Sequence, residues 1–278
     1  MDRTTDFLIL LFTLGVTAAT AKSGASAGVT AGAAKLSETR SEQALTGVVQ
    51  LQPRPWLTLS AIPSLVHVSD EVSGRAVSSS GPGDLPLVAG AATAFRAAWS
   101  PSVGAALIVT LPVGDAACGL GAGETAVGAN VAAGLSPTDR LHVWAGASRN
   151  VSGLATQSTL SAPRSTALRV DAGYDVARRW RASASFAADV GQADSTQALS
   201  RMIGAGAAYA IAGPLMLVID GSHGLTSSSP RWVLSLGLGT AFASTSPVSP
   251  TSPLQRQQTS LARGVNRGSG SGKTGGCP

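Results

Sequence analysis

The sequence of 278 residues predicts an all-β fold, an antiparallel transmembrane β-barrel of about 12 strands. The main observation is a change of face at every residue from 169 to 191, on both sides of a tight turn. One face is apolar and the other holds the charges, as in Leu168, Val170 and Tyr174 against Arg169, Asp171 and Asp175. Successive side chains of a strand point to opposite faces, so the pattern predicts a hairpin with one apolar side. The same alternation recurs along the chain, behind a segment typical of an export signal.

The composition agrees with a protein that faces lipid. Charged residues make up 13 % of the chain, well below the usual globular share. Much of the net charge of +5 comes from the C-terminal region, which has no acid and carries Arg256, Arg263, Arg267 and Lys273. The remaining chain is nearly neutral and has no basic stripe, so we expect no nucleic-acid partner.

The two ends of the chain predict segments outside the barrel. Residues 1–21 are typical of a secretory signal peptide, with an apolar core from Phe7 to Val16 and an Ala19-Thr20-Ala21 cleavage site. Residues 243–278 are rich in Ser, Pro, Gln, Thr and Gly, which is typical of a disordered tail. We therefore expect the barrel over 22–242, in the bacterial outer membrane, with the lipid bilayer around it.

Alternation also places the strands in order. We expect them near 27–36, 45–52, 55–68, 86–99, 102–112, 125–135, 140–151, 166–177, 180–190, 200–211, 214–223 and 231–242. Short connections such as 178–179 alternate with longer ones such as 69–85 and 113–124. Outer-membrane barrels have short periplasmic turns and long outer loops. Both ends of the barrel then lie on the periplasmic side. That requires an even number of strands, and hence the weakly patterned first strand near 27–36.

Aromatic residues favour a membrane barrel over a soluble β-sandwich. Trp56, Trp99 and Trp180 lie within two residues of short turns. Trp232 begins the last expected strand and Phe242 ends it. Aromatic girdles at both interfaces are typical of outer-membrane barrels. In addition, many apolar-face positions are Ala, and the strands exceed the ~5–6 residues usual in globular sheets.

The polar faces of the strands would line the lumen. The candidate lining residues are Arg96, Asn130, His142, Arg169, Asp171, Asp175, Arg181, Asp189 and Asp220. Two hairpin registers around Arg178 remain open: one puts Asp175 opposite Arg181, and the other puts Arg169 opposite Asp189. Either register makes an interior acid–base pair, which the low dielectric beside lipid favours over lone charges. Such charges would either select what passes or brace a narrow lumen.

The sequence does not predict catalysis. Ser222 and His223 are adjacent on an expected strand, so they point to opposite faces and cannot easily share a proton. Cys118 and Cys277 are far apart and predict neither a metal cluster nor a disulfide framework. We therefore expect no enzyme, no catalytic residue, no metal and no cofactor.

Several blocks of sequence resemble one known family. Gly81-Pro82-Gly83-Asp84-Leu85-Pro86-Leu87 is similar to a G-x-G-D-L-x-L block that opens a strand, and Leu111-Pro112-Val113-Gly114-Asp115 to an L-P-T-G-D strand end. The loop Gly119–Gly123, the following Thr125–Gly128, and Arg231-Trp232 with the last strand also agree. The family is that of the outer-membrane transporters linked to the meta-pathway of phenol degradation. The sequence departs from its pattern at Val113, at Ala126 and in the long tail. The resemblance covers residues 81–242 and implies a barrel that moves small, often aromatic or apolar, compounds.

Together these observations predict a porin-like outer-membrane channel or facilitator for passive uptake or efflux of a small-molecule solute. The alternative is a structural or surface-interaction barrel with a closed lumen, acting through loops 69–85 and 113–124. A channel predicts single-channel conductance, whereas a structural barrel predicts none. The sequence leaves open the solute, the oligomeric state and whether the lumen is open.

Overall fold

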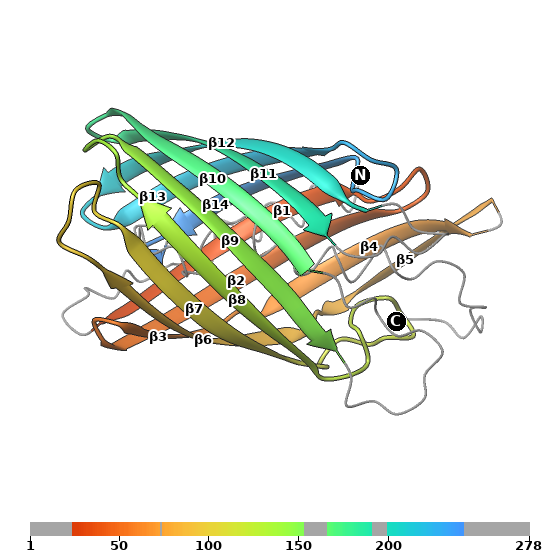
Figure 1. Cartoon of the computed structure of the whole chain (residues 1–278). Coiled ribbons are helices and arrows are strands. Elements are labelled where there is room, and N and C mark those ends of the chain that lie inside the picture. Colours follow the sequence, from red (N-terminus) through yellow and green to blue (C-terminus); the bar gives the residue numbers. More distant parts are fainter. Residues whose placement is uncertain (1–23, 73, 153–165, 191–198, 242–278) are drawn as a thin grey trace.

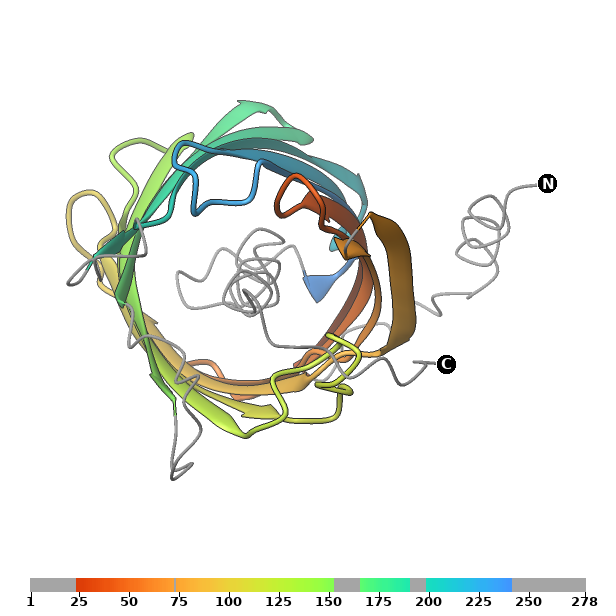
Figure 2. The same ribbon diagram turned by 90° about the vertical axis from the view of Figure 1, so that its right-hand side faces the viewer.

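The computed structural model describes residues 24–72, 74–152, 166–190 and 199–241. These residues form a closed antiparallel barrel (Figure 1), and its ring of strands is seen end-on in Figure 2. The predicted signal peptide 1–21 and the predicted tail 243–278 lie outside the described residues. Within the described ranges, no helix has the length and apolar character needed to cross a membrane.

The strands follow one another around the ring in chain order. They are β1 Ala25–Lys35, β2 Ser41–Arg54, β3 Leu57–Ala61, β4 Ser64–Val72, β5 Arg75–Pro82, β6 Leu85–Ala94, β7 Ser102–Leu111, β8 Ala126–Leu135, β9 Leu141–Ser152, β10 Thr166–Ala177, β11 Trp180–Val190, β12 Arg201–Ala212, β13 Leu215–Gly224 and β14 Trp232–Gly239. β1 pairs with both β2 and β14 and so closes the ring. The first strand predicted near 27–36 is thus confirmed as the closing strand.

Two pairs of these strands are single strands with an interruption. β3 and β4 both pair with β2, and their partners β6 and β5 also follow one another along the chain. Counting each interrupted strand once, the barrel has the predicted 12 antiparallel strands. Ile62 and Pro63 interrupt the first strand, and Gly83 and Asp84 interrupt the second. Proline has no N–H to donate to a ladder, which accounts for the first interruption.

The β4–β5 hairpin corrects the prediction that 69–85 is a loop. Its pairs run from Leu65↔Pro82 to Val72↔Arg75, and it extends beyond its neighbours at one end of the barrel (Figure 1). The alternation of apolar residues did not predict this hairpin, because a strand outside the lipid needs no apolar face. The strand predicted over 86–99 ends earlier, at Ala94, and Trp99 and Ser100 adopt positive φ in the turn that follows.

The two ends of the barrel differ in the connections they carry. One end, called the short-turn end, has the connections 55–56, 95–101, 136–140, 178–179 and 213–214, as well as the start of β1 and the end of β14. The opposite end, called the long-loop end, has 36–40, the β4–β5 hairpin, 112–125 and 225–231 among its described connections. The first and last strands therefore start and finish at the same end, as the even strand number requires.

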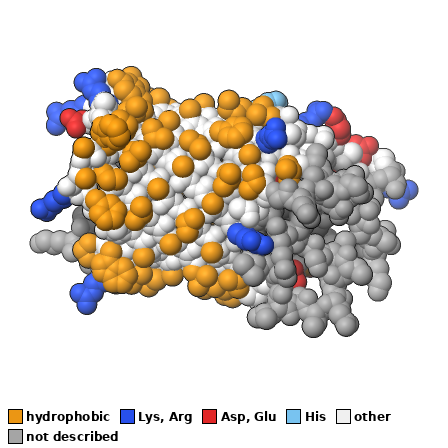
Figure 3. All heavy atoms as spheres, viewed as in Figure 1, with side chains coloured by type: hydrophobic (Ala, Val, Ile, Leu, Met, Phe, Trp, Pro, Cys, Tyr) orange, Lys and Arg blue, Asp and Glu red, His pale blue; other side chains and the backbone are white. Residues whose placement is uncertain are grey.

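The outer face of the barrel is apolar along the middle of the strands. On β7, Leu107 is 52 % exposed, whereas the preceding Ala106 is 8 % exposed. Figure 3 shows apolar side chains over the middle of the wall, with Lys and Arg side chains mostly toward the ends. Trp56, Trp99, Trp180 and Trp232 are all exposed at the surface. The alternation predicted from the sequence thus separates an apolar outer face from an inner face.

Candidate functional site

β10 and β11 carry five charged side chains on the inner face, and four of them form two ion pairs. Their register places Asp175 opposite Arg181, which is the first of the two registers that the sequence left open. Arg181 Nε donates to Asp175 Oδ1 at 2.6 Å, and Nη2 donates to Oδ2 at 3.1 Å. On β10 alone, Arg169 binds both carboxylate oxygens of Asp171, each at 2.6 Å. Such two-pronged pairs fix the geometry of the guanidinium groups.

His142 on β9 extends the Asp175 pair to a third strand. Its Nε2 lies 3.4 Å from Asp175 Oδ2, and its Nδ1 lies 2.8 Å from Ser136 Oγ. The imidazole stacks on Trp144 with 5.8 Å between ring centroids. Hydroxyl, imidazole and carboxylate also occur in this order in hydrolytic triads. Here Arg181 already binds both oxygens of the carboxylate, so we interpret the cluster as a brace that joins β9, β10 and β11.

The remaining predicted lumen residues do not all reach the inner wall. Asn130 on β8 and Asp220 on β13 are buried on the inner face, and Asp189 on β11 is half-buried there. Arg169 faces Ala187 across the hairpin and is not opposite Asp189. Arg96 is exposed in the connection 95–101, because β6 ends before it and the alternation no longer applies.

A glycine makes room for the Asp220 carboxylate. Gly206 is the direct partner of Asp220 on β12, and Ser183 is the partner of Gly206 on β11. A Cβ atom at 206 would overlap Asp220 Oδ1 and would lie 2.9 Å from Ser183 Oγ. The missing side chain therefore lets the carboxylate lie across β12.

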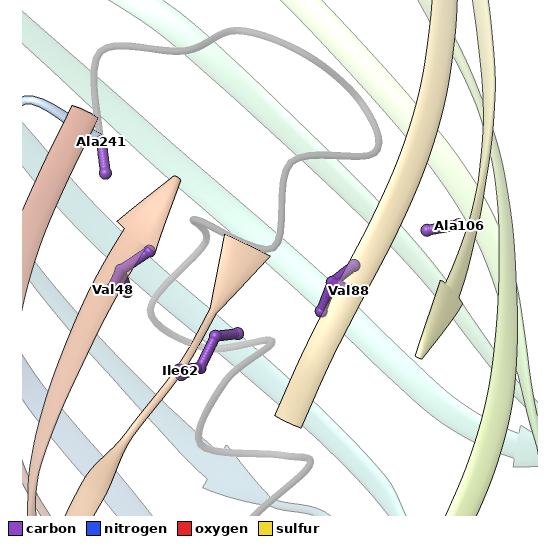
Figure 4. Packing of buried hydrophobic residues seen from close by; sticks show 5 residues of the cluster. All are labelled: Val48, Ile62, Val88, Ala106 and Ala241. Atoms are coloured by element: carbon purple, nitrogen blue, oxygen red, sulfur yellow. The ribbon is translucent and has the colours of Figure 1, made fainter. Parts of the chain in front are cut away.

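An apolar cluster lies on the wall opposite these charges, among buried polar residues such as Glu42, Gln50 and Ser60. Val48 on β2, Ile62, Val88 on β6 and Ala106 on β7 form a buried cluster with Ala241 (Figure 4). The alternation places them inside, since Val49 and Leu87, the outward neighbours of two of them, are exposed. In the ring order, β2 to β7 lie across from β10 to β13. The lumen therefore has an apolar cluster across from the charged pairs of β10 and β11, an arrangement that strand-by-strand alternation did not predict.

Asp84 anchors a loop at one end of the barrel, a role that the sequence did not indicate. Its buried carboxylate accepts hydrogen bonds from Gly114 N at 3.2 Å and from Ala122 N at 2.7 Å. Both donors belong to the connection 112–125 at the long-loop end. A Cβ at Gly121 would overlap Asp84 Oδ1, so the glycine allows the close approach. Asp84 thus fixes this loop to the point where β5 meets β6.

A signal for this contact was present in the sequence. The contact joins three of the blocks that carry the family resemblance, namely 81–87, 111–115 and 119–123. Their shared spacing reflects one folded unit at the barrel mouth. A single sequence could not show that the acid of the first block binds the backbone of the other two.

The loop 112–125 also carries Cys118. The Asp115 carboxylate accepts from Ala117 N at 2.8 Å, and Leu120 N donates to Asp115 O at 2.9 Å. Cys118 is disulfide-bonded. Cys277, the second cysteine of the sequence, lies outside the described residues, and so does the expectation about the two cysteines as a pair. Among the described residues, no group of three or more His, Cys, Asp or Glu is arranged to hold a metal ion.

Ser222 and His223 lie as the alternation predicted. The Ser222 hydroxyl oxygen is buried, whereas His223 is exposed on the outer face. The two side chains therefore point away from each other across the wall, which does not suit a shared proton.

Of the comparisons with known proteins, the one with solved structures supports the barrel fold. No protein-family profile and no curated protein matches the sequence. Among solved structures, the chain is similar to the COG4313 outer membrane channel from Pseudomonas putida F1, with a TM-score of 0.61 and 18 % identity over 78 % of this chain and 95 % of that chain. It is also similar to the KdgM porin in complex with disordered oligogalacturonate, with a TM-score of 0.49 and 10 % identity over 77 % of this chain and 97 % of that one. The first of these likenesses shows that the chain has the barrel fold of an outer membrane channel.

Proposed function

We propose that the protein is a passive channel or facilitator for small molecules in the bacterial outer membrane. The observation that carries the proposal is a closed barrel with an apolar exterior and an inner wall of paired charges. An apolar exterior suits hydrocarbon, and a polar interior is typical of barrels that conduct. The fold shared with an outer membrane channel supports this reading.

The apolar cluster and the charged pairs across the lumen favour a solute with both an apolar and a polar part. The cluster of Val48, Ile62 and Val88 offers an apolar surface, and Arg169 and Arg181 offer cations on the facing wall. A small aromatic molecule with a hydroxyl or carboxylate would contact both sides at once. This chemistry agrees with the aromatic or apolar compounds implied by the family resemblance.

The test replaces both inner-wall arginines with glutamine, Arg169→Gln with Arg181→Gln. The replacement leaves the Asp171 and Asp175 carboxylates without their guanidinium partners, so the lumen becomes more negative. We expect the reversal potential in a planar bilayer under a KCl gradient to shift toward that of K⁺.

The matched control is Arg178→Gln with Arg179→Gln, which removes the same charge from the exposed β10–β11 turn. If the double variant and this control have the same reversal potential, the inner arginines take no part in permeation. Folded protein that never conducts favours the alternative, a structural or surface-interaction barrel with a closed lumen.

A further inference from the structure

A groove crosses the outer face of the barrel from β10 to β13. Its floor is one row of small outward residues that are direct partners across the four strands, namely Ala172, Ala184, Ala205 and Gly221. Phe186 and Ile203, the next outward residues of β11 and β12, rise beside this floor and are 43 % and 52 % exposed. The hollow, called the outer groove, has a volume of about 760 Å³ and an almost entirely apolar surface.

The outer groove runs obliquely to the ends of the strands. On its long-loop side, Val170 and Phe186 lie four residues inside the ends of β10 and β11. On β13, by contrast, the bordering residue is His223, next to last in the strand and paired with Trp232, the first residue of β14. Barrel strands are tilted, so a row across them changes depth in the membrane (Figure 1). The groove therefore begins at the long-loop end at β13 and descends toward the middle of the wall at β10.

Outward cations lie at the shallow end of the groove. Arg201 begins β12 and precedes Ile203 by two residues, a rise of about 7 Å on the same face. Lys35 ends β1 and pairs with Trp232, which in turn pairs with His223. Neither Arg201 nor Lys35 forms an ion pair with an acid that the structure describes. The described strands β6, β7 and β8, farther around the ring, contain no Lys or Arg.

The connection 225–231 holds the backbone of Arg201 in place. Arg201 N donates to Ser229 Oγ at 2.8 Å, and Arg201 O accepts from Leu225 N at 2.8 Å and from Ser229 Oγ at 2.7 Å. Ser229 is itself buried. The loop therefore fixes the point from which the Arg201 side chain extends to the outer surface, and a site with a fixed backbone loses less entropy on binding.

These features fit a lipid with more than one phosphate. The exposed Trp232 marks the membrane interface, where outer-membrane barrels carry aromatic girdles. At this level Arg201, His223 and Lys35 offer N–H donors of the kind that bind phosphate. Arg201 and Lys35 lie three strands apart, roughly 14 Å, so a headgroup with two separated phosphates can contact both. Below them, the apolar floor also spans three inter-strand spacings, which suits an acyl chain.

A second copy of the chain fits this face less well. Two barrels in one membrane insert in the same direction, so a two-fold axis between them lies along the membrane normal and brings residues of equal depth together. A contact centred on the outer groove would then bring Arg201 and Lys35 of the two copies toward each other. Like charges in an interface disfavour association, whereas lipid phosphates neutralise them.

We propose that the outer groove binds one phosphorylated, acylated lipid of the outer leaflet, of the chemical class of lipid A. One phosphate lies at Arg201 and His223, a second lies at Lys35, and an acyl chain lies along the floor from Gly221 toward Ala172. The long-loop end faces the cell exterior in barrels with short periplasmic turns, which places the phosphates in the outer leaflet. The site lies outside the lumen, so its test does not depend on the channel function proposed above.

The first experiment varies the lipid. Full-length protein in a non-ionic detergent is titrated with lipid A carrying two phosphates, and bound lipid is counted by native mass spectrometry. We expect one tightly bound molecule per chain, and binding roughly tenfold weaker for lipid A without phosphates, for its deacylated form and for phosphatidylglycerol, which has a single phosphate. Equally tight binding of phosphatidylglycerol overturns the assignment to lipid A. A complex of two chains without lipid shows that a second copy covers the face and overturns the proposal.

The second experiment varies the charges at the shallow end. Arg201→Gln with Lys35→Gln should weaken binding of lipid A roughly tenfold, because both phosphates lose a cation. The matched control, Arg178→Gln with Arg179→Gln, removes the same charge from the short-turn end and should bind lipid A as the wild type does. Equal affinities of the two double variants would place the phosphates elsewhere and overturn the proposal.

The third experiment fills the floor of the groove. Ala205→Phe puts a ring where the acyl chain lies, so we expect roughly tenfold weaker binding of lipid A. Ala89→Phe is the matched control, since Ala89 is also an exposed outward alanine, on β6. Both rings face lipid, where a larger apolar side chain leaves the inner wall unchanged. If Ala205→Phe binds lipid A as tightly as Ala89→Phe, the groove is not the acyl-chain site.

Discussion

The loop that carries Cys118 should depend on a single carboxylate. Asp84→Asn keeps the shape of the side chain but replaces one oxygen with an NH₂ group. That group would face either Gly114 N–H or Ala122 N–H, both of which are donors. Hydrogen bonds to charged groups contribute about 1.5–3 kcal/mol each, and the remaining bond becomes neutral and weaker. We therefore expect the closed loop to lose about 3 kcal/mol relative to the open loop.

Hydrogen–deuterium exchange with mass spectrometry measures this loss. A change of about 3 kcal/mol should speed amide exchange in the peptide covering 112–125 roughly a hundredfold. Exchange in the β10–β11 hairpin serves as the internal reference and should not change. Asp139→Asn, at an exposed acid in the connection 136–140, is the matched control variant. If the loop amides of Asp84→Asn exchange no faster than those of the control, the proposed anchor is wrong.

Two further substitutions test the inner and the outer face. Gly206→Val would place a side chain where the Asp220 carboxylate lies, so we expect a loss of about 1–3 kcal/mol in urea unfolding from lipid vesicles. Gly221→Ala, where the nearest atom lies 3.7 Å from the new Cβ, should lose little, and an equal loss in both would contradict the packing argument. Leu107→Arg puts a charge on the outer face in the middle of β7 and should cost about 2–4 kcal/mol in lipid. Val113→Arg, equally exposed but in a loop, should be neutral, and similar costs at both sites would argue against lipid around the strands.

The faces of the strands were predictable because alternation is a local property. Val103 and Leu107 are exposed and Ala106 and Thr110 are buried, as the period of two in the sequence requires. Alternation gave wrong predictions where the chain leaves the strand or the lipid, because only a strand in the membrane wall needs one apolar face. Arg96 lies beyond the last residue of β6, and the β4–β5 hairpin extends past the wall, where no apolar face is needed.

The candidate site was predictable only in part. The Asp175–Arg181 pair follows from one of two local registers, since the tight turn restricts the choices, but the additional contact with His142 requires β9 to lie beside β10. The contacts of Asp84 join segments about thirty or more residues apart. A single sequence does not encode such a pairing in any periodic signal.

By itself, the sequence determined the number of strands, the direction in which they run and which side of each strand is apolar. These properties follow from side-chain alternation, from turn length and from the even number of strands that a barrel needs when its first strand starts and its last strand finishes at the same end. The tertiary structure alone decided that an apolar cluster in the lumen lies across from the charged pairs, and that Asp84 anchors the loop of Cys118. Both depend on which strands become neighbours or opposites when the sheet closes, and closure is a property of the whole ring and of no single strand.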